Sequence, residues 1–318
     1  MTTRRMTRGQ WGLWLLFGGP VAVFVVWAVS DNPPLFFKTL LNGLTLASLY
    51  FLVASGFTLV FGLMRNVNLA HGSLYLFGAY VGWFVGEHTG SWVLAVFAGF
   101  LSAALLGLLM QLLVFRHRQG QDLRQTLVTI GLSIVLADLM LWIWGGEIYT
   151  FDPPSWIYGS TTLPLINKFP TYRLMVLLAS IVIGVGLWLL LARTRIGMMI
   201  RAGVDDRGML AASGVNVQLV FALTFAIGAG LAGLAGVVGG TALSISPGED
   251  TRYLLASLVV VIVGGMGSVV GAAIGALLIG LAEQFGLAYA PTYSVVFTFV
   301  IMVVALAFKP RGLMGKAT

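Results

Sequence analysis

Residues 64–75, MRNVNLAHGSLY, form a short polar stretch between two long apolar segments. Polar side chains at membrane depth are costly unless they face protein or a water-filled cavity. The stretch therefore predicts a helix break with irregular backbone that lines a path. We expect Asn66 and Asn68 to satisfy backbone groups that the break frees, with solute contact as the alternative. His71 either caps a half-helix, lines the path or holds the break through a carbonyl, and this last, structural role is favoured.

The composition places the chain in a lipid bilayer. Of its 318 residues, 58% are hydrophobic and 9% are charged, and the mean hydropathy is +0.96. Soluble domains carry about 25% charged residues, so this chain cannot cover its surface in water. It has no cysteine for disulfides or a thiolate metal site, and its 41 glycines suit close helix packing in lipid. The expected fold class is an all-α polytopic membrane protein with a single transmembrane domain of residues 1–318.

Apolar runs divide the chain into predicted membrane crossings, each of which needs about 20 residues. The first run, 11–30, follows three arginines as in a signal peptide. It is too long for a signal core and lacks a convincing cleavage site, so we expect an extra N-terminal helix that is retained. About eight full crossings are predicted, at 11–30, 41–63, 69–86, 92–115, 126–145, 174–192, 219–246 and 293–308.

The basic residues predict the orientation. Most of the 18 Lys and Arg residues lie before the first crossing, in alternate loops, and after the last crossing, which places them on one side. Only Lys38, Lys168, Arg173 and Arg252 are expected on the other side. The positive-inside rule makes the first side cytoplasmic, together with both termini. The net charge of +7 is then a signal of topology and not of a nucleic-acid partner.

The apolar run 254–284 is longer than a single crossing needs. Because both termini are expected in the cytoplasm, the number of full crossings must be even. A broken pair of half-helices or two short crossings meets this condition, and one long tilted helix with an outward C-terminus is the alternative. A break costs least in the middle of the run, where four glycines lie: Gly264, Gly265, Gly267 and Gly271. We therefore expect a broken or re-entrant helical hairpin in addition to the eight crossings.

Two segments, 41–86 and 219–265, each join glycine-rich helices through a short polar break, and the second break lies at 244–250. Inverted repeats with broken helices near the midplane of the bilayer are common in transporters. The likeness of the two segments is one of composition, so the sequence leaves a repeat open.

Sequence motifs for catalysis and for cofactor binding are missing. The chain has no P-loop for ATP and no H-E-x-x-H, and its three His are far apart. It has no visible nucleophile–base or acidic pair, so an enzyme is not expected. Asp138 is the one acid well inside a predicted crossing, and it is either a polar point on a translocation path or a carboxylate that is buried with a local partner or near the interface. Candidates for the path or its helix breaks are Asn66, Asn68, His71, Asp138, Gly265 and Gly267.

The loop 193–218 predicts a short cytoplasmic helix. Asp205 or Asp206 can cap its N-terminus, and Gly214 can end it. Met209 and Leu210 would then be exposed between polar ends, which favours docking into the groove of a partner. A helix that lies flat on the membrane is the alternative. The candidate residues for coupling to a partner are Arg201, Asp205, Asp206, Arg207, Met209, Leu210 and Gly214.

Several motifs together resemble one transporter family. Residues 68–72 are similar to the N-x-A-H-G signature of the branched-chain amino acid ABC transporter permeases, and the loop 193–218 resembles the coupling loop of that family. Leu210 departs from the pattern, because a small residue is expected at its position. The resemblance runs from about residue 40 to the end and is closer to the shorter of the two paired permease members. The further matching segments are 42–50, 56–62, 78–80, 201–202, 207, 214–216, 222–240, 263–268 and 309–315.

The resemblance implies a permease subunit of an ABC importer for branched-chain or other amino acids in the bacterial inner membrane. Such a subunit forms half of a translocation path with a second homologous permease or a copy of itself. A periplasmic or extracellular solute-binding protein does much of the selecting, so the sequence does not name the solute. Cytoplasmic P-loop ATPase subunits use the ATP, and no cofactor is expected in this chain. The alternative is an ion-coupled secondary transporter of a small polar solute, for which one intramembrane Asp is thin support.

Overall fold

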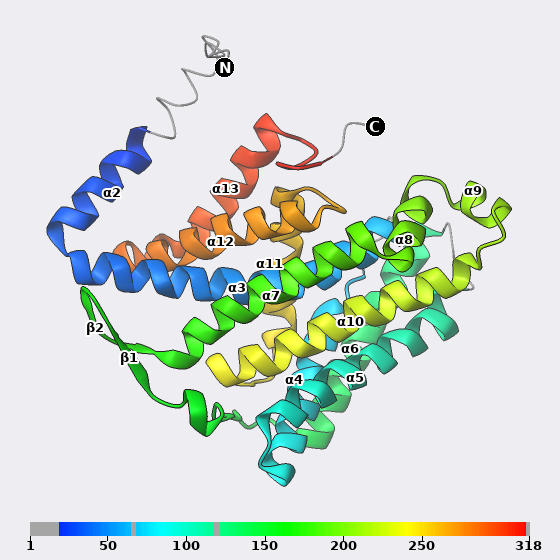
Figure 1. Ribbon diagram of the computed structural model, residues 1–318, viewed down its shortest axis with the longest axis horizontal. Coiled ribbons are helices and arrows are strands. Elements are labelled where there is room, and N and C mark those ends of the chain that lie inside the picture. Colours follow the sequence, from blue (N-terminus) through cyan, green and yellow to red (C-terminus); the bar gives the residue numbers. More distant parts are fainter. Residues whose placement is uncertain (1–18, 65–67, 117–120, 316–318) are drawn as a thin grey trace.

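The computed structural model describes residues 19–64, 68–116 and 121–315, and these are largely helical (Figure 1). Two strands form an antiparallel hairpin, β1 (Ser160–Leu163) and β2 (Ile166–Pro170). A π-helical stretch, Gln111–Phe115, continues α5, and two short 3₁₀ turns lie at Ser155–Ile157 and Pro291–Tyr293. The α-helices are α2 (Gly19–Asp31), α3 (Pro33–Met64), α4 (His71–Thr89), α5 (Trp92–Met110), α6 (Asp122–Trp144), α7 (Thr171–Arg193), α8 (Arg195–Asp205), α9 (Arg207–Ala212), α10 (Val217–Ala242), α11 (Glu249–Gly264), α12 (Val269–Tyr289) and α13 (Ser294–Phe308).

Helices α3 and α10 form the centre of the bundle. Helix α10 packs against α3, α4 and α5, and α3 also packs against α7, α11 and α12 (Figure 1). Glycines bring the backbones together, because a Cβ at Gly56 would lie 2.2 Å from the carbonyl oxygen of Gly228. A Cβ at Gly78 would lie 2.2 Å from the Cα of Gly233. The glycine content thus serves the close helix packing that the composition predicts.

The bundle has two ends, which we name the hairpin end and the α8–α9 end. At the hairpin end, Trp92 Nε1 donates to Thr241 Oγ1 at 3.0 Å, and the Tyr172 hydroxyl donates to the Val238 carbonyl at 3.0 Å. These bonds hold the starts of α5 and α7 beside the last turns of α10. The segment between α6 and α7, which contains β1 and β2, covers this end. At the opposite end, α8 and α9 connect α7 to α10 (Figure 1).

The chain is a multi-pass membrane protein. Within the described residues, six helices are long and apolar enough to span a membrane. The expected count of eight crossings is not confirmed, since α4 is not one of the six and two further apolar helices are shorter. One of the two shorter apolar helices, α2, is the described part of the helix expected at 11–30. Its Phe24 packs edge to face against Tyr289 of α12, with ring centroids 5.2 Å apart. The six spans are Pro33–Gly62, Trp92–Phe115, Leu123–Trp144, Thr171–Arg193, Val217–Ala242 and Val269–Tyr289.

The apolar run 254–284 is broken, as predicted. Helix α11 ends at Gly264 and α12 begins at Val269. The two helices pack side by side, because a Cβ at Gly271 would lie 2.3 Å from the Gly264 carbonyl oxygen and one at Gly275 would lie 2.4 Å from the Val260 carbonyl oxygen. Val260 and Gly275 each lie four residues farther from the turn than Gly264 and Gly271 do. The chain direction therefore reverses at the turn, and α11 and α12 are antiparallel. The alternative of one long tilted helix is wrong.

Candidate functional site

The first helix break is held by Asn68 and His71. Asn68 Oδ1 accepts a hydrogen bond from the Ala70 N–H at 3.1 Å, and the Asn68 carbonyl accepts one from the His71 N–H at 3.2 Å. His71 Nε2 lies 3.0 Å from the Val53 carbonyl oxygen, which makes this nitrogen the donor. Both side chains are buried. Hydrogen bonds of this kind are what a structural role would use, and that role stays a prediction, whereas Asn66 lies outside the described residues.

Helix α4 begins deep inside the bundle. Its first residue, His71, contacts Val53 of α3, which lies about three helical turns, roughly 17 Å, before the end of α3. The His71 ring also packs edge to face on Phe57, with centroids 5.3 Å apart. The chain therefore returns from the end of α3 towards its middle before α4 starts. In the described part of the chain, Asn68 Nδ2 and His71 Nδ1 are buried there without a hydrogen-bond partner.

The second break, between α10 and α11, meets the first. Gly248 precedes α11 with φ of +92°, a backbone conformation that favours glycine. A Cβ at Gly72 would lie 1.9 Å from the Asp250 carbonyl oxygen, so the first turns of α4 and α11 touch. One turn further on, the rings of Tyr75 and Tyr253 stack with centroids 4.1 Å apart. The two half-helices thus start at one place in the middle of the bundle.

An ion-paired cluster lies beside this meeting point, and the sequence analysis did not single it out. Arg252 Nη1 lies 3.5 Å from Glu249 Oε2, and Arg252 Nη2 lies 3.7 Å from Glu283 Oε1. The Tyr50 hydroxyl donates to Glu283 Oε2 at 2.7 Å. A signal for the pair was present in the sequence, because Arg252 and Glu283 lie about equally far from the turn 265–268. An antiparallel hairpin that bends there brings the two side chains together.

The turn between α11 and α12 needs its glycines. Gly265 has φ of +109° and Gly267 has φ of +81°. Only glycine adopts such angles without strain. The C-terminal segment after α13 returns to this turn, where the Leu313 N–H donates to the Val263 carbonyl and the Met314 N–H donates to the Gly264 carbonyl, each at 2.9 Å. The tail therefore satisfies carbonyls at the end of α11 that a helix leaves open.

The loop 193–218 contains the capped short helix that the sequence predicts. Asp206 Oδ1 accepts from the N–H groups of Gly208 at 2.8 Å and Met209 at 3.0 Å, which makes Asp206 the N-cap of α9. Gly214 follows the helix with φ of +79°. The Met209 side chain is 68% exposed, as expected. Leu210 is only 6% exposed, so its predicted exposure is wrong.

The burial of Leu210 has a simple cause. Helix α9 folds back against α8 and α10, and on so short a helix one apolar side chain faces inward when the next faces outward. The guanidinium of Arg207 lies 4.9 Å from the centroid of the Phe221 ring, which ties the start of α9 to α10. Asp205 is the last residue of α8 and Arg201 is exposed on the same helix.

A cavity of about 650 Å³ joins this loop to the α11–α12 turn. It brings together three residues that the sequence analysis assigned to two different regions, Arg201 and Asp205 from α8 and Gly267 from the turn. The last turns of α3 and α7 form its other walls. Helix α8 and the α11–α12 turn therefore face one another across one shared cavity.

Asp138 lies apart from these residues. Its side chain is exposed on α6, a helix that packs mainly against α4. The interpretation of Asp138 as a carboxylate buried within the chain is therefore wrong. The interpretations as a point on the path and as a residue near the interface stay open.

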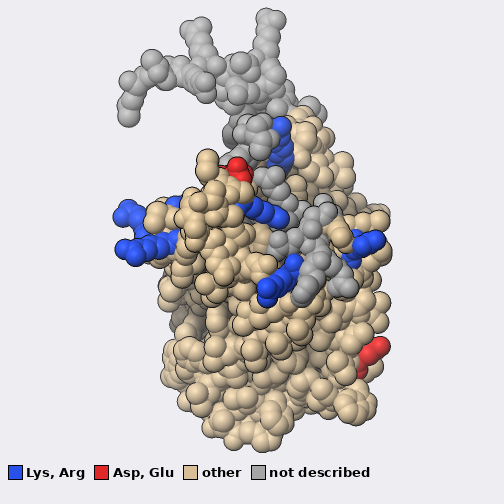
Figure 2. Space-filling model, turned by 90° about the vertical axis from the view of Figure 1, so that its right-hand side faces the viewer, with Lys and Arg blue, Asp and Glu red and all other residues tan. Residues whose placement is uncertain are grey.

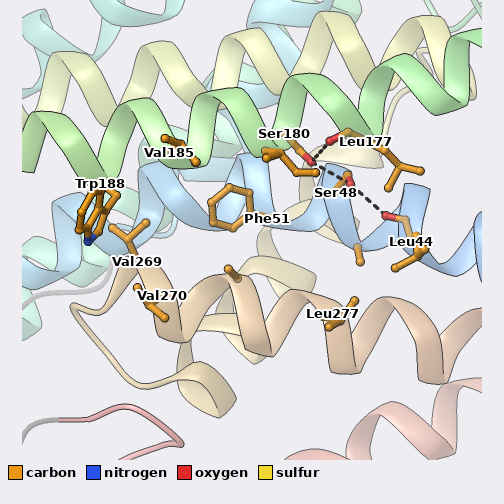
Figure 3. Close-up of a pocket in the computed structure, with 14 residues that line it drawn as sticks. Leu44, Ser48, Phe51, Leu177, Ser180, Val185, Trp188, Val269, Val270 and Leu277 are labelled. Carbon is orange, nitrogen blue, oxygen red and sulfur yellow. Dashed lines mark hydrogen bonds between the residues drawn. The ribbon is translucent and has the colours of Figure 1, made fainter.

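A groove of about 450 Å³ between α3, α7 and α12 offers a contrast (Figure 3). Leu44, Phe51, Val185 and Trp188 are among its apolar lining residues. Ser180 Oγ lies 2.9 Å from Ser48 Oγ, and each hydroxyl also lies within hydrogen-bond distance of a main-chain carbonyl of its own helix. The groove thus presents a hydrocarbon surface whose hydroxyls are already bonded, which suits apolar contact and not the binding of a charged solute.

The described residues contain no group of three or more His, Asp and Glu that could hold a metal ion. What they contain is two helix breaks that meet in mid-bundle, a half-exposed ion-paired cluster beside them, and a capped helix at one end. Intramembrane polar groups of this kind are the features that transporters use to line a path.

The comparisons agree with this class of protein. Residues 39–306 match the family described as branched-chain amino acid transport system / permease component. The chain is 30% identical to the high-affinity branched-chain amino acid transport system permease protein BraD of Pseudomonas aeruginosa, over 88% of this chain and 96% of that protein. It is 31% identical to the corresponding protein LivH of Escherichia coli, over 91% of this chain and 98% of that protein.

The chain therefore belongs to the branched-chain amino acid transport permease family. A more distant relative is the ribose import permease protein RbsC of Escherichia coli, which is 30% identical over 83% of each chain. No solved structure matches.

Proposed function

We propose that the chain is a transmembrane permease subunit of an ABC importer for branched-chain or other amino acids. It forms half of a translocation path with a second homologous permease or a copy of itself, and it receives solute from a binding protein outside the membrane. The ATP is used by partner ATPase subunits, and this chain holds no cofactor of its own. Relatives named for branched-chain amino acid transport support this choice of solute, although the ribose permease among the relatives shows that the solute varies between related chains.

The α8–α9 end is the cytoplasmic side in this proposal. Lys and Arg side chains gather on that face (Figure 2). Arg193, Arg195 and Arg201 are exposed there, and Lys309 and Arg311 follow α13 as exposed residues. Loops rich in Lys and Arg stay in the cytoplasm. With eight full crossings and the α11–α12 hairpin, both termini lie on the cytoplasmic side of the bacterial inner membrane.

The exposed Met209 on the capped helix α9 is the observation that carries the proposal. A flexible apolar side chain that is exposed on a short helix favours docking into an apolar groove of another protein. The residues 201–214 would form that contact with the ATPase, with Arg201, Asp205 and Arg207 around it. In this proposal a movement of α8 changes the cavity that Arg201 and Asp205 share with Gly267, at the turn that also contains Gly265. A secondary transporter, the alternative, has no use for such a loop.

Replacing Met209 with Asp tests the proposal. Burial of one Met contributes about 1.5–3 kcal/mol, so the variant should bind the ATPase subunits roughly 10- to 100-fold more weakly. ATP-dependent amino acid uptake should fall with it, as measured by co-purification and by uptake into vesicles. Leu165→Asp is the matched control, because Leu165 is 59% exposed in the loop of the hairpin at the other end. Normal co-purification and uptake by Met209→Asp would contradict the proposal, and so would uptake driven by an ion gradient without ATP.

The two helix breaks also support an inverted repeat. Residues 65–70 separate α3 from α4, and residues 243–248 separate α10 from α11, so the two breaks have equal length. Gly72 and Asp250, which touch, are each the second residue of their helix, and Tyr75 and Tyr253, which stack, are each the fifth. Contacts between equivalent positions are what a two-fold axis between the units requires. We infer that 41–86 and 219–265 are related in this way, with the axis near the middle of the membrane.

A further inference from the structure

The ion-paired cluster of Tyr50, Glu249, Arg252 and Glu283 has a composition that helix packing does not explain. It holds one positive and two negative groups, and its ion pairs are long, at 3.5 and 3.7 Å. The side chain of Arg252 is 48% exposed, against 24% for Glu249 and 26% for Glu283. The cluster is therefore open on one side, and its guanidinium has room for a further acceptor.

The cluster lies at membrane depth. Tyr50, which donates to Glu283, is close to the midpoint of the 32-residue helix α3. A charged side chain at this depth is costly against lipid and is normally found facing protein or water. Since Arg252 is 48% exposed at this depth, we infer that its open side faces a second protein chain or a water-filled space between chains rather than lipid. In an importer whose path lies between two permease subunits, that space is the path.

We propose that the cluster of Tyr50, Glu249, Arg252 and Glu283 forms a transit site for the charged head of an amino acid. Arg252 receives the α-carboxylate, and the two glutamates, with an excess of one negative charge, receive the α-ammonium. Leu255 lies one turn after Arg252 on the same face and is 56% exposed, so it offers an apolar contact for the side chain of the solute. The proposal rests on the proposed function, because it assumes that the solute is an amino acid.

Other sites in the described residues suit this role less well. The groove in Figure 3 has hydroxyls that are bonded already and no ionisable group. Asp138 provides a single negative charge on a different helix. The cavity beside Gly267 contains Arg201 and Asp205, but it lies at the α8–α9 end and not at mid-depth. Compared with these three sites, the cluster on α11 and α12 combines both signs of charge with a place beside Tyr50, near the midpoint of α3.

The test uses the complete importer, reconstituted in lipid vesicles with its ATPase subunits, its binding protein and radiolabelled leucine. Arg252→Gln and Glu283→Gln keep the size of the side chain and remove its charge. Each substitution should lower leucine uptake at least about tenfold, because it removes one charge-assisted contact with the solute. ATP hydrolysis should stay within about twofold of the unmodified importer, since the subunits still assemble. Arg252→Lys should restore most of the uptake. Arg173→Gln is the matched control, because Arg173 lies on α7 and donates to Asn42 instead of to the cluster, and its uptake should not change.

Several outcomes separate this inference from the proposed function. If the unmodified importer takes up no amino acid, the proposed function fails. If it takes up leucine and Arg252→Gln does so equally well, only the transit site is refuted. If uptake and ATP hydrolysis fall together, or a variant does not assemble, the substitution has disturbed the packing of the subunits. A photoreactive diazirine analogue of leucine then tests the site in the unmodified importer. Labelling of α11 or α12 near Leu255 or Glu283 supports the site, and labelling confined to other helices overturns it.

Discussion

Replacement of Gly72 by Ala should separate the two half-helices that meet in the middle of the bundle. The new Cβ would lie 1.9 Å from the Asp250 carbonyl oxygen, 2.8 Å from its carbonyl carbon and 2.9 Å from the Cβ of Leu254. The obstacles are backbone atoms and a Cβ, which cannot rotate away, so α4 or α11 must shift. Overpacking of a tight core costs typically 1–3 kcal/mol, and a backbone collision belongs at the upper end, at about 3 kcal/mol.

The measurement is the free energy of unfolding of the purified chain in lipid-like micelles, together with uptake by the reconstituted importer. Gly131→Ala in α6 is the matched control, because a Cβ at Gly131 has no atom within 4 Å. Both substitutions replace a helical glycine and gain about 0.5–1 kcal/mol from reduced backbone entropy. The difference between the two variants therefore isolates the collision.

We expect Gly131→Ala to be as stable as the original chain or slightly more so, and Gly72→Ala to be less stable by about 2–3 kcal/mol. Uptake should fall in Gly72→Ala even in the fraction that assembles, because the meeting point of the breaks is displaced. If Gly72→Ala unfolds at the same free energy as Gly131→Ala and transports normally, the first turns of α4 and α11 do not touch. The arrangement of the two breaks would then be wrong.

Three further predictions follow from other parts of the molecule. Reporter fusions should place the C-terminus in the cytoplasm and the loop 147–168 outside, and a C-terminus outside would contradict the orientation inferred from the basic residues. Asn68→Leu leaves the Ala70 N–H without its acceptor and should cost about 1–3 kcal/mol, with slower uptake and unchanged choice of solute in competition assays; a changed choice of solute would show that Asn68 contacts it. Met314→Pro removes the N–H that bonds the Gly264 carbonyl and should speed hydrogen exchange in the last turn of α11, whereas Met314→Ala, which keeps that N–H, should not.

Much of the fold was predictable, because membranes limit the choices. A bilayer accepts only spanning helices or barrels, so the apolar runs predicted helices where helices occur. The break in 254–284 followed from the length of the run and its glycines, and Gly265 and Gly267 do occupy positive φ angles. A cap at Asp205 or Asp206 was predicted because an Asp side chain accepts from free N–H groups, and the structure shows that Asp206 is the cap. Each of these inferences depends on local chemistry.

The features that were missed depend on contacts between distant parts of the chain. Leu210 was expected to be exposed because it sits beside Met209, but it is buried on a helix that packs against α8 and α10. The depth at which α4 starts is set by His71 against Val53, and nothing in the local sequence gives that depth. Arg252 was assigned to an outer loop because it precedes an apolar run. The structure places it as the fourth residue of α11, paired with Glu283.

In the proposed repeat, the start of the half-helix carries charged side chains in only one of the two units. In the first unit, the first and fourth residues of the half-helix are His71 and Leu74, both fully buried. In the second unit, the same positions hold Glu249 and Arg252, whose side chains are partly exposed and paired with each other. A two-fold arrangement by itself would treat these positions alike, so the difference reflects what each unit faces. The first unit is sealed within the bundle and can use neutral groups to hold its break. The second faces outward at membrane depth, where charges persist only if water, a second permease subunit or a charged solute meets them.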